Sequence, residues 1–140
     1  MKKIIVIAIA ILSSNMIFAQ KTKDVPVPVK AAFQKQYPNV SKVEWEKEDG
    51  NYEAEFDINK IENSVLYDSS GKLLETEMEI QLKDLPAGVL EYVQTNYKGQ
   101  KVNEAAKITD ANGTVTFEAE IGKMDVIFDE KGKFLKEKKD

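Results

Sequence analysis

Two kinds of hydrophobic spacing follow one another along the chain. Between residues 26 and 37 the apolar side chains recur at intervals of three and four residues, which predicts an amphipathic helix that ends before Pro38. Between residues 43 and 80 they recur every second residue, which predicts short strands that each bury one face. The pattern therefore predicts one helix followed by about four antiparallel strands.

The second half of the chain repeats this order. Three blocks of similar sequence occur twice: 26–37 lies over 86–97, 52–56 over 117–121, and 65–75 over 126–136. Blocks that repeat in the same order indicate a duplicated structural unit. We therefore predict an α+β fold of two tandem repeats, residues 24–81 and 82–140, each with one helix packed on about four antiparallel strands and with the two sheets side by side.

Turn residues separate the predicted strands. Asp68, Asp110 and Asp129 are each followed, three positions later, by a glycine, which is the preference of a type I turn. A calcium loop is the alternative, but the spacing of ligands in an EF-hand is absent and each segment offers few oxygen atoms. We interpret these segments as turns.

Residues 1–19 differ in character from the rest. They begin with Lys2 and Lys3, continue with the apolar run Ile4 to Leu12 and end at Ala19. This composition predicts a secretory signal peptide, and its apolar run is shorter than the roughly 20 residues that a membrane span needs. We therefore expect a periplasmic or secreted protein without stable membrane insertion after cleavage.

The composition excludes several kinds of chemistry. The chain has no His and no Cys, and all 20 of its basic residues are Lys. Nucleophile pairs that depend on imidazole or thiol, the common zinc sites and disulfides are therefore excluded. After residue 19, 18 Lys stand against 24 acidic residues, a formal charge of −6 that makes nucleic-acid binding unexpected. We expect no cofactor.

One face of the first predicted sheet is rich in carboxylates. The members of this acidic face, all at the parity opposite to the apolar positions, are Glu44, Glu46, Glu53, Glu55, Asp57, Glu75, Glu77 and Glu79. Carboxylates this dense repel one another, so the face could steer a basic protein or peptide or hold divalent cations. The alternative is a solvated face that keeps the protein soluble. The pair Glu53 and Glu55 lacks the cleft that glycoside hydrolysis requires, so we do not expect an enzyme.

Trp45 is the one Trp of the chain. Its parity places it on the apolar side of its strand, which predicts core packing against the helix. An exposed Trp would instead indicate a binding hot spot.

The repeated segments resemble a known family. The runs PVPVKAAFQKQYPNVSKVEWEKEDGNYEAEFD and VLYDSSGKLLETEMEI, repeated as LPAGVLEYVQTNY, TFEAEI and VIFDEKGKFLK, are similar to the PepSY-like, beta-lactamase-inhibitor-like exported proteins of bacteria. The resemblance implies two helix-plus-strands units and a non-catalytic exported protein, and related inhibitor domains bind a target enzyme across a concave sheet. We therefore expect a non-catalytic binding module that acts through the outer face of its sheet and restrains an envelope enzyme or peptidase. The disulfides of the beta-lactamase inhibitors are absent here. An acidic envelope protein that binds cations or small ligands is the alternative function.

Overall fold

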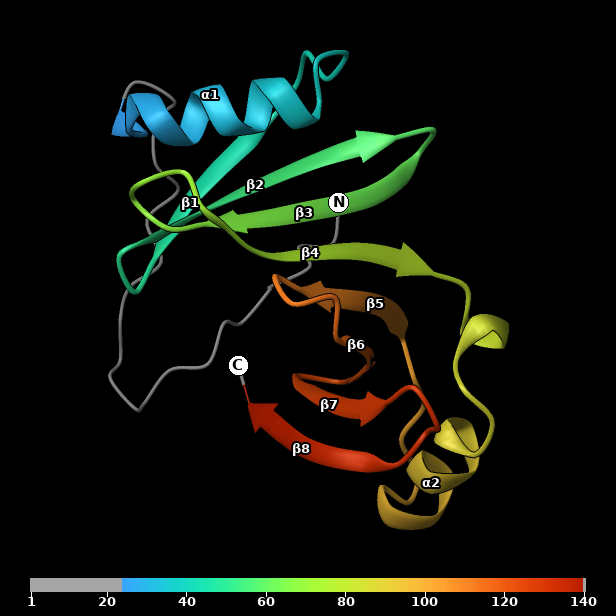
Figure 1. Cartoon of the computed structure of the whole chain (residues 1–140). Helices are drawn as coiled ribbons and strands as arrows, with labels where there is room; N and C mark the ends of the chain where they lie inside the picture. The colour runs from blue at the N-terminus through green and yellow to red at the C-terminus, as the bar shows by residue number, and fades with distance from the viewer. Residues whose placement is uncertain (1–23, 140) are drawn as a thin grey trace. The chain divides into compact units, whose positions relative to one another are not determined.

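The computed structural model describes residues 24–139, so the predicted signal peptide, residues 1–19, lies outside the described residues (Figure 1). The fold is α+β, as the periodicity predicts, and its eight antiparallel strands follow chain order from β1 to β8. The elements are α1 (Val27–Gln36), β1 (Glu44–Glu48), β2 (Asn51–Ile58), β3 (Ile61–Tyr67), β4 (Leu73–Ile80), the short 3-10 helix η2 (Leu82–Asp84), α2 (Val89–Asn96), β5 (Glu104–Asp110), β6 (Val115–Ile121), β7 (Met124–Asp129) and β8 (Phe134–Lys139).

The described chain divides into two compact units, with the boundary between Thr76 and Glu77 in the middle of β4. The helices α1 and α2, of 10 and 8 residues, both fall short of a membrane span, and residues 24–139 offer no other candidate. Each unit is described by itself below.

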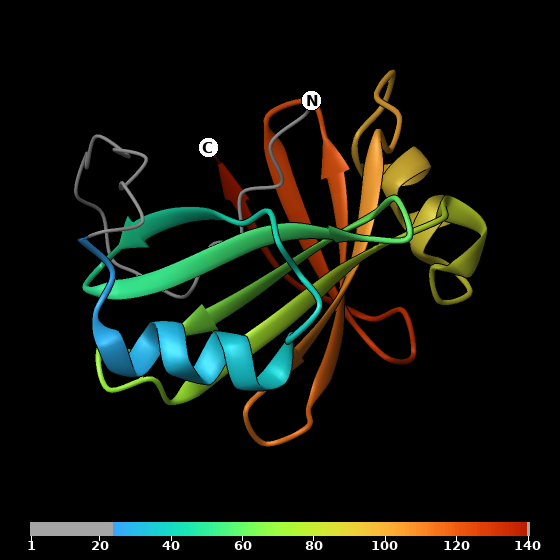
Figure 2. The same ribbon diagram turned by 90° about the horizontal axis from the view of Figure 1, so that it is seen from above.

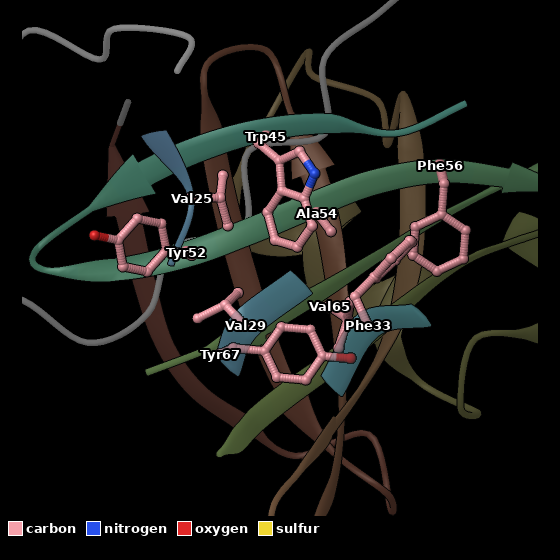
Figure 3. Close-up of a cluster of buried hydrophobic side chains, with 9 residues drawn as sticks. All are labelled: Val25, Val29, Phe33, Trp45, Tyr52, Ala54, Phe56, Val65 and Tyr67. Atoms are coloured by element: carbon pink, nitrogen blue, oxygen red, sulfur yellow. The ribbon is translucent and has the colours of Figure 1, made fainter. Parts of the chain in front are cut away.

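In the first unit α1 packs on one face of the strands (Figures 1 and 2). Val29 and Phe33, one helical turn apart, point toward the strand residues of the same cluster (Figure 3). The ring of Phe33 forms T-shaped pairs with the rings of Trp45 and Phe56, at centroid distances of 5.4 and 5.2 Å. Trp45 is 4% exposed, which confirms that it belongs to the core.

The hydroxyl of Tyr67 is the polar end of this core. It donates a hydrogen bond of 2.9 Å to Oε1 of Gln36, the last residue of α1. Burial raises the pKa of Tyr67, so the hydroxyl keeps its proton and remains a donor at every physiological pH. This bond ties the end of the helix to the end of β3.

The second unit has its own core. Val89 and Val93 of α2 are buried with apolar residues of the neighbouring strands, among them Ala119, Val126 and Phe128. Tyr92 stacks on Phe134 with ring centroids 5.3 Å apart and planes at 12°. In both units, therefore, the apolar residues that recur along one side of the helix are the ones that pack against the strands.

Two tight hairpins set the strand register in the first unit. Asp49 and Gly50 join β1 to β2, and Asn59 and Lys60 join β2 to β3, all four with positive φ. Positive φ at both central residues defines a type I′ turn, whose twist matches that of the strands it joins. The hairpins therefore leave the strands no freedom to slip.

The three Asp turns have the predicted form. Gly71, Gly113 and Gly132 each donate a backbone hydrogen bond of 2.9 to 3.0 Å to the carbonyl of the Asp three residues earlier. Oδ1 of Asp68 also accepts backbone bonds from Ser70 and Lys72 at 2.8 and 3.0 Å. Hydrogen bonds from the Ser70 hydroxyl and the Lys72 backbone hold the pKa of Asp68 below its usual value. The Asp carboxylates therefore accept hydrogen bonds from backbone groups of their own turns.

Two of these turn glycines touch the start of a helix. A Cβ added to Gly71 would lie 2.5 Å from the carbonyl oxygen of Pro28, and one added to Gly132 would lie 2.4 Å from that of Ala87. Gly113 has φ +84, like Gly71, but nothing lies within 4 Å of its added Cβ. The glycines therefore allow the β3–β4 and β7–β8 turns to press against the backbone at the start of α1 and α2.

Replacing Gly71 by Ala should destabilise the protein more than the same change at Gly113. Both variants incur about 1 to 2 kcal/mol for a side chain at positive φ, and Gly71→Ala adds about 1 to 3 kcal/mol for the clash with Pro28. Urea unfolding followed by far-ultraviolet circular dichroism measures both losses. Equal losses would show that the turn does not press on the helix.

Truncating Phe33 should remove much of the stability of the first unit. Phe33→Ala empties a site enclosed by Trp45 and Phe56, so we expect a loss of about 3 to 5 kcal/mol. Val27, 78% exposed on the same helix, is the control, and Val27→Ala should change stability by less than about 0.5 kcal/mol. Trp45 fluorescence follows unfolding directly. A loss from Phe33→Ala as small as that of the control would contradict the described packing.

Candidate functional site

The candidate site is the sheet face of the first unit opposite to α1. The β1–β2 register places Glu44 directly opposite Glu55, and Glu46 directly opposite Glu53. Directly opposed residues in antiparallel strands project to the same face. Because Trp45 and Ala54 of the same strands lie in the core, these four carboxylates project from the other side of the sheet.

Three of these carboxylates form a tight group. Each of Glu46, Glu53 and Glu55 places a carboxylate oxygen within 4.8 Å of the others. Glu53 is 2% exposed, whereas Glu46 and Glu55 are partly exposed. The group thus has a buried carboxylate beneath and two that reach solvent.

The third strand completes the surroundings of this group. The β2–β3 register places Ser64 opposite Glu55, and Leu66 opposite Glu53. Ser64 is 4% exposed and its Oγ has no hydrogen-bond partner among the described residues. The sequence reasoning missed Ser64. The two-residue turn Asn59–Lys60 could have located it, because this turn fixes the β2–β3 register that places Ser64 opposite Glu55. The turn is hard to recognise because it lacks the glycine usual in such hairpins.

The other predicted members of the acidic face lie in different settings. Glu44 and Asp57 are exposed, and Glu75 and Glu79 are partly exposed. Glu77 is 3% exposed, so not every carboxylate of this parity faces solvent. Glu77 and Glu79 lie on the part of β4 that belongs to the second unit. Among the described residues, the structure brings together Glu46, Glu53 and Glu55 of the predicted set.

The corresponding face of the second unit carries both signs of charge. Glu104 lies opposite Glu120, and Ala106 opposite Glu118, on the side of β5 and β6 away from the buried Ala105 and Ala119. The β7–β8 register then places Lys138 opposite Asp125. In this unit the chain supplies an ammonium group on the same face as its carboxylates.

Side by side on one sheet face, the three grouped carboxylates can bind cations. Hard oxygen ligands suit divalent ions such as Ca²⁺, and carboxylates also accept hydrogen bonds from Lys or Arg of another molecule.

Comparison with known proteins places the chain in a family. The family model described as "Putative beta-lactamase-inhibitor-like, PepSY-like" matches residues 17–75 and 51–136. No curated protein matches the chain.

Two solved structures illustrate the fold. A "putative periplasmic" protein from Bacteroides eggerthii has 19% identity and a TM-score of 0.72, with 82% of this chain and 88% of that chain covered. A "BLIP-like" protein from Bacteroides fragilis has 26% identity and a TM-score of 0.63, with 81% and 86% covered. The family model spans well over half of the residues and agrees with the resemblance seen in the sequence. The chain therefore belongs to the PepSY-like, beta-lactamase-inhibitor-like family.

Proposed function

We propose that this protein is an exported, non-catalytic binding module whose acidic face recognises a basic segment of a protein or peptide in the bacterial envelope. The signal-like residues 1–19 support export, and the B. eggerthii protein of similar fold is described as "putative periplasmic". The B. fragilis relative is described as BLIP-like, which supports protein binding and, for this chain, restraint of an envelope enzyme or peptidase.

The proposal includes a duplication, with repeats 24–81 and 82–140, each a helix on its own strands. Corresponding turns support it, because Gly71 approaches Pro28 in the first half as Gly132 approaches Ala87 in the second. The helix ends also correspond. The N–H of Tyr37 donates to the carbonyl of Phe33, and that of Tyr97 to the carbonyl of Val93, each at 2.8 Å.

The observation that carries the proposed function is the difference between these repeats. When 65–75 is laid over 126–136, Glu75 takes the place of Lys136, and Glu46 corresponds to Ala106 in the preceding strands. The first repeat therefore concentrates negative charge where the second mixes both signs. Such a concentration destabilises a sheet by repulsion, and a cationic partner offsets that repulsion when it binds.

Charge complementarity also suits an exported protein that must find its partner by diffusion. Opposite potentials raise the rate of encounter and disfavour partners of like charge. The partner implied by this face is rich in Lys or Arg, and its binding depends on salt because part of the acidic face is exposed.

Reversing two exposed or partly exposed charges should weaken recognition without disturbing the core. We expect the double variant Glu44→Lys and Glu75→Lys to weaken binding at least tenfold, because each new ammonium group repels the Lys or Arg side chains of the partner. The fold should survive because neither residue is buried. The partner is isolated on the immobilised protein from envelope extract, purified and titrated by calorimetry at two salt concentrations. Glu53 is unsuitable for this test because its burial would couple the change to folding.

The matched control is the double variant Glu104→Lys and Glu130→Lys, which reverses two charges of the second unit. This control should bind the partner as the parent protein does. Unchanged affinity of the Glu44 and Glu75 variant, or affinity insensitive to salt, would contradict recognition by the acidic face. Inhibition is tested separately, by measuring whether the purified partner loses enzymatic activity when it binds.

A further inference from the structure

We infer that Glu46, Glu53, Glu55 and Ser64 form a binding site for one Ca²⁺ ion. This inference goes beyond protein recognition and does not require it. It rests on the carboxylate group of β1 and β2 together with a separate observation on β3.

The size of the carboxylate group suits calcium. Ca²⁺ binds oxygen ligands at about 2.3 to 2.6 Å, so two ligands on opposite sides of the ion lie up to roughly 5 Å apart. The grouped oxygens of Glu46, Glu53 and Glu55 lie within 4.8 Å of one another, so small adjustments of their side chains bring all three within reach of one ion. Mg²⁺ requires bonds of about 2.0 to 2.1 Å and a stricter octahedral geometry.

Ser64 provides the independent observation. The residue is 4% exposed, and its buried Oγ has no hydrogen-bond partner among the described residues. Buried hydroxyls nearly always have a partner, and a bound ion with its water molecules would provide one for Ser64. Ser64 lies directly opposite Glu55 in the β2–β3 ladder, and the two side chains therefore project to the same face.

These four residues supply a ligand set that calcium accepts. Three carboxylates provide negative charge, and the serine hydroxyl binds either the ion or one of its water molecules. Water completes the six to eight ligands of the ion on the open side, where Glu46 and Glu55 are partly exposed. The ion offsets the repulsion among the carboxylates and gives the Ser64 hydroxyl an acceptor or a metal to contact.

The second unit offers an internal comparison. There Ala106 stands opposite Glu118, where the first unit has Glu46 opposite Glu53. Asp125 corresponds to Ser64 and lies opposite Lys138. The second unit thus keeps three carboxylates at these positions, with Asp125 in place of the Ser64 hydroxyl, but it places the ammonium group of Lys138 opposite one of them. That ammonium group repels a cation, so we place the ion in the first unit alone.

The experiment titrates CaCl₂ into the chelator-treated mature protein by calorimetry, with thermal unfolding measured in parallel. We expect one ion per chain, with Kd on the order of 0.1 to 1 mM, the range of extracellular calcium modules. Glu46→Gln should weaken binding at least tenfold, and Ser64→Ala several-fold. Glu104→Gln, a change of the same type in the second unit, should leave the affinity unchanged.

A second measurement separates loss of the site from loss of the fold. Because Glu46 repels Glu53 and Glu55, Glu46→Gln should raise Tm in the absence of calcium while it abolishes the rise in Tm that calcium causes. An unfolded or damaged variant would instead lower Tm without calcium. Trp45 fluorescence confirms that the core is intact.

Three results would overturn the site. The first is the absence of calcium binding when the CaCl₂ concentration reaches 10 times the upper limit of the expected Kd. The second is an equal rise in Tm with MgCl₂ or with NaCl of matched ionic strength, because this would show general screening of the acidic face. The third is calcium binding that Glu46→Gln leaves unchanged, because the ion would then lie elsewhere.

Discussion

The register of β1, β2 and β3 is the constraint on which the rest of the first unit depends. Hairpins with only two residues in each turn fix this register, and the positive φ angles of Asp49, Gly50, Asn59 and Lys60 make those turns possible. A slip of one residue would send every side chain to the opposite face. Trp45 would then leave the core and the carboxylates would enter it, so the hydrophobic core and the acidic face are maintained by the same pairing.

The helix determines which face takes the charge. Val29 and Phe33 cover one side of the strands so completely that Ala54 and Val65 have no measurable exposure. Carboxylates have no place there, because a buried charge requires compensation. They gather on the other side, where the buried Glu53 shows that this face also has an interior of its own.

The sequence predicts the elements better than their pairing. Periodicity locates both helices and the strands because side-chain direction depends on local geometry, and Trp45 falls in the core for that reason. Ser64 could not be recognised in this way, because its importance comes from the residue opposite to it in space. The burial of Glu53 and Glu77 could not be predicted either. The alternation of residues along a strand gives the face to which a side chain projects, but it does not show what covers that face. The Asp turns were predictable because their chemistry is contained within five residues.

The contact between Gly71 and the carbonyl of Pro28 has a consequence for the order of folding. It joins the beginning of the first unit to a turn that lies beyond three of its strands, so it closes a long chain segment. Closing such a segment loses chain entropy before any contact compensates for it. We therefore expect the start of the helix to reach its final position only after the hairpins have brought that turn into place.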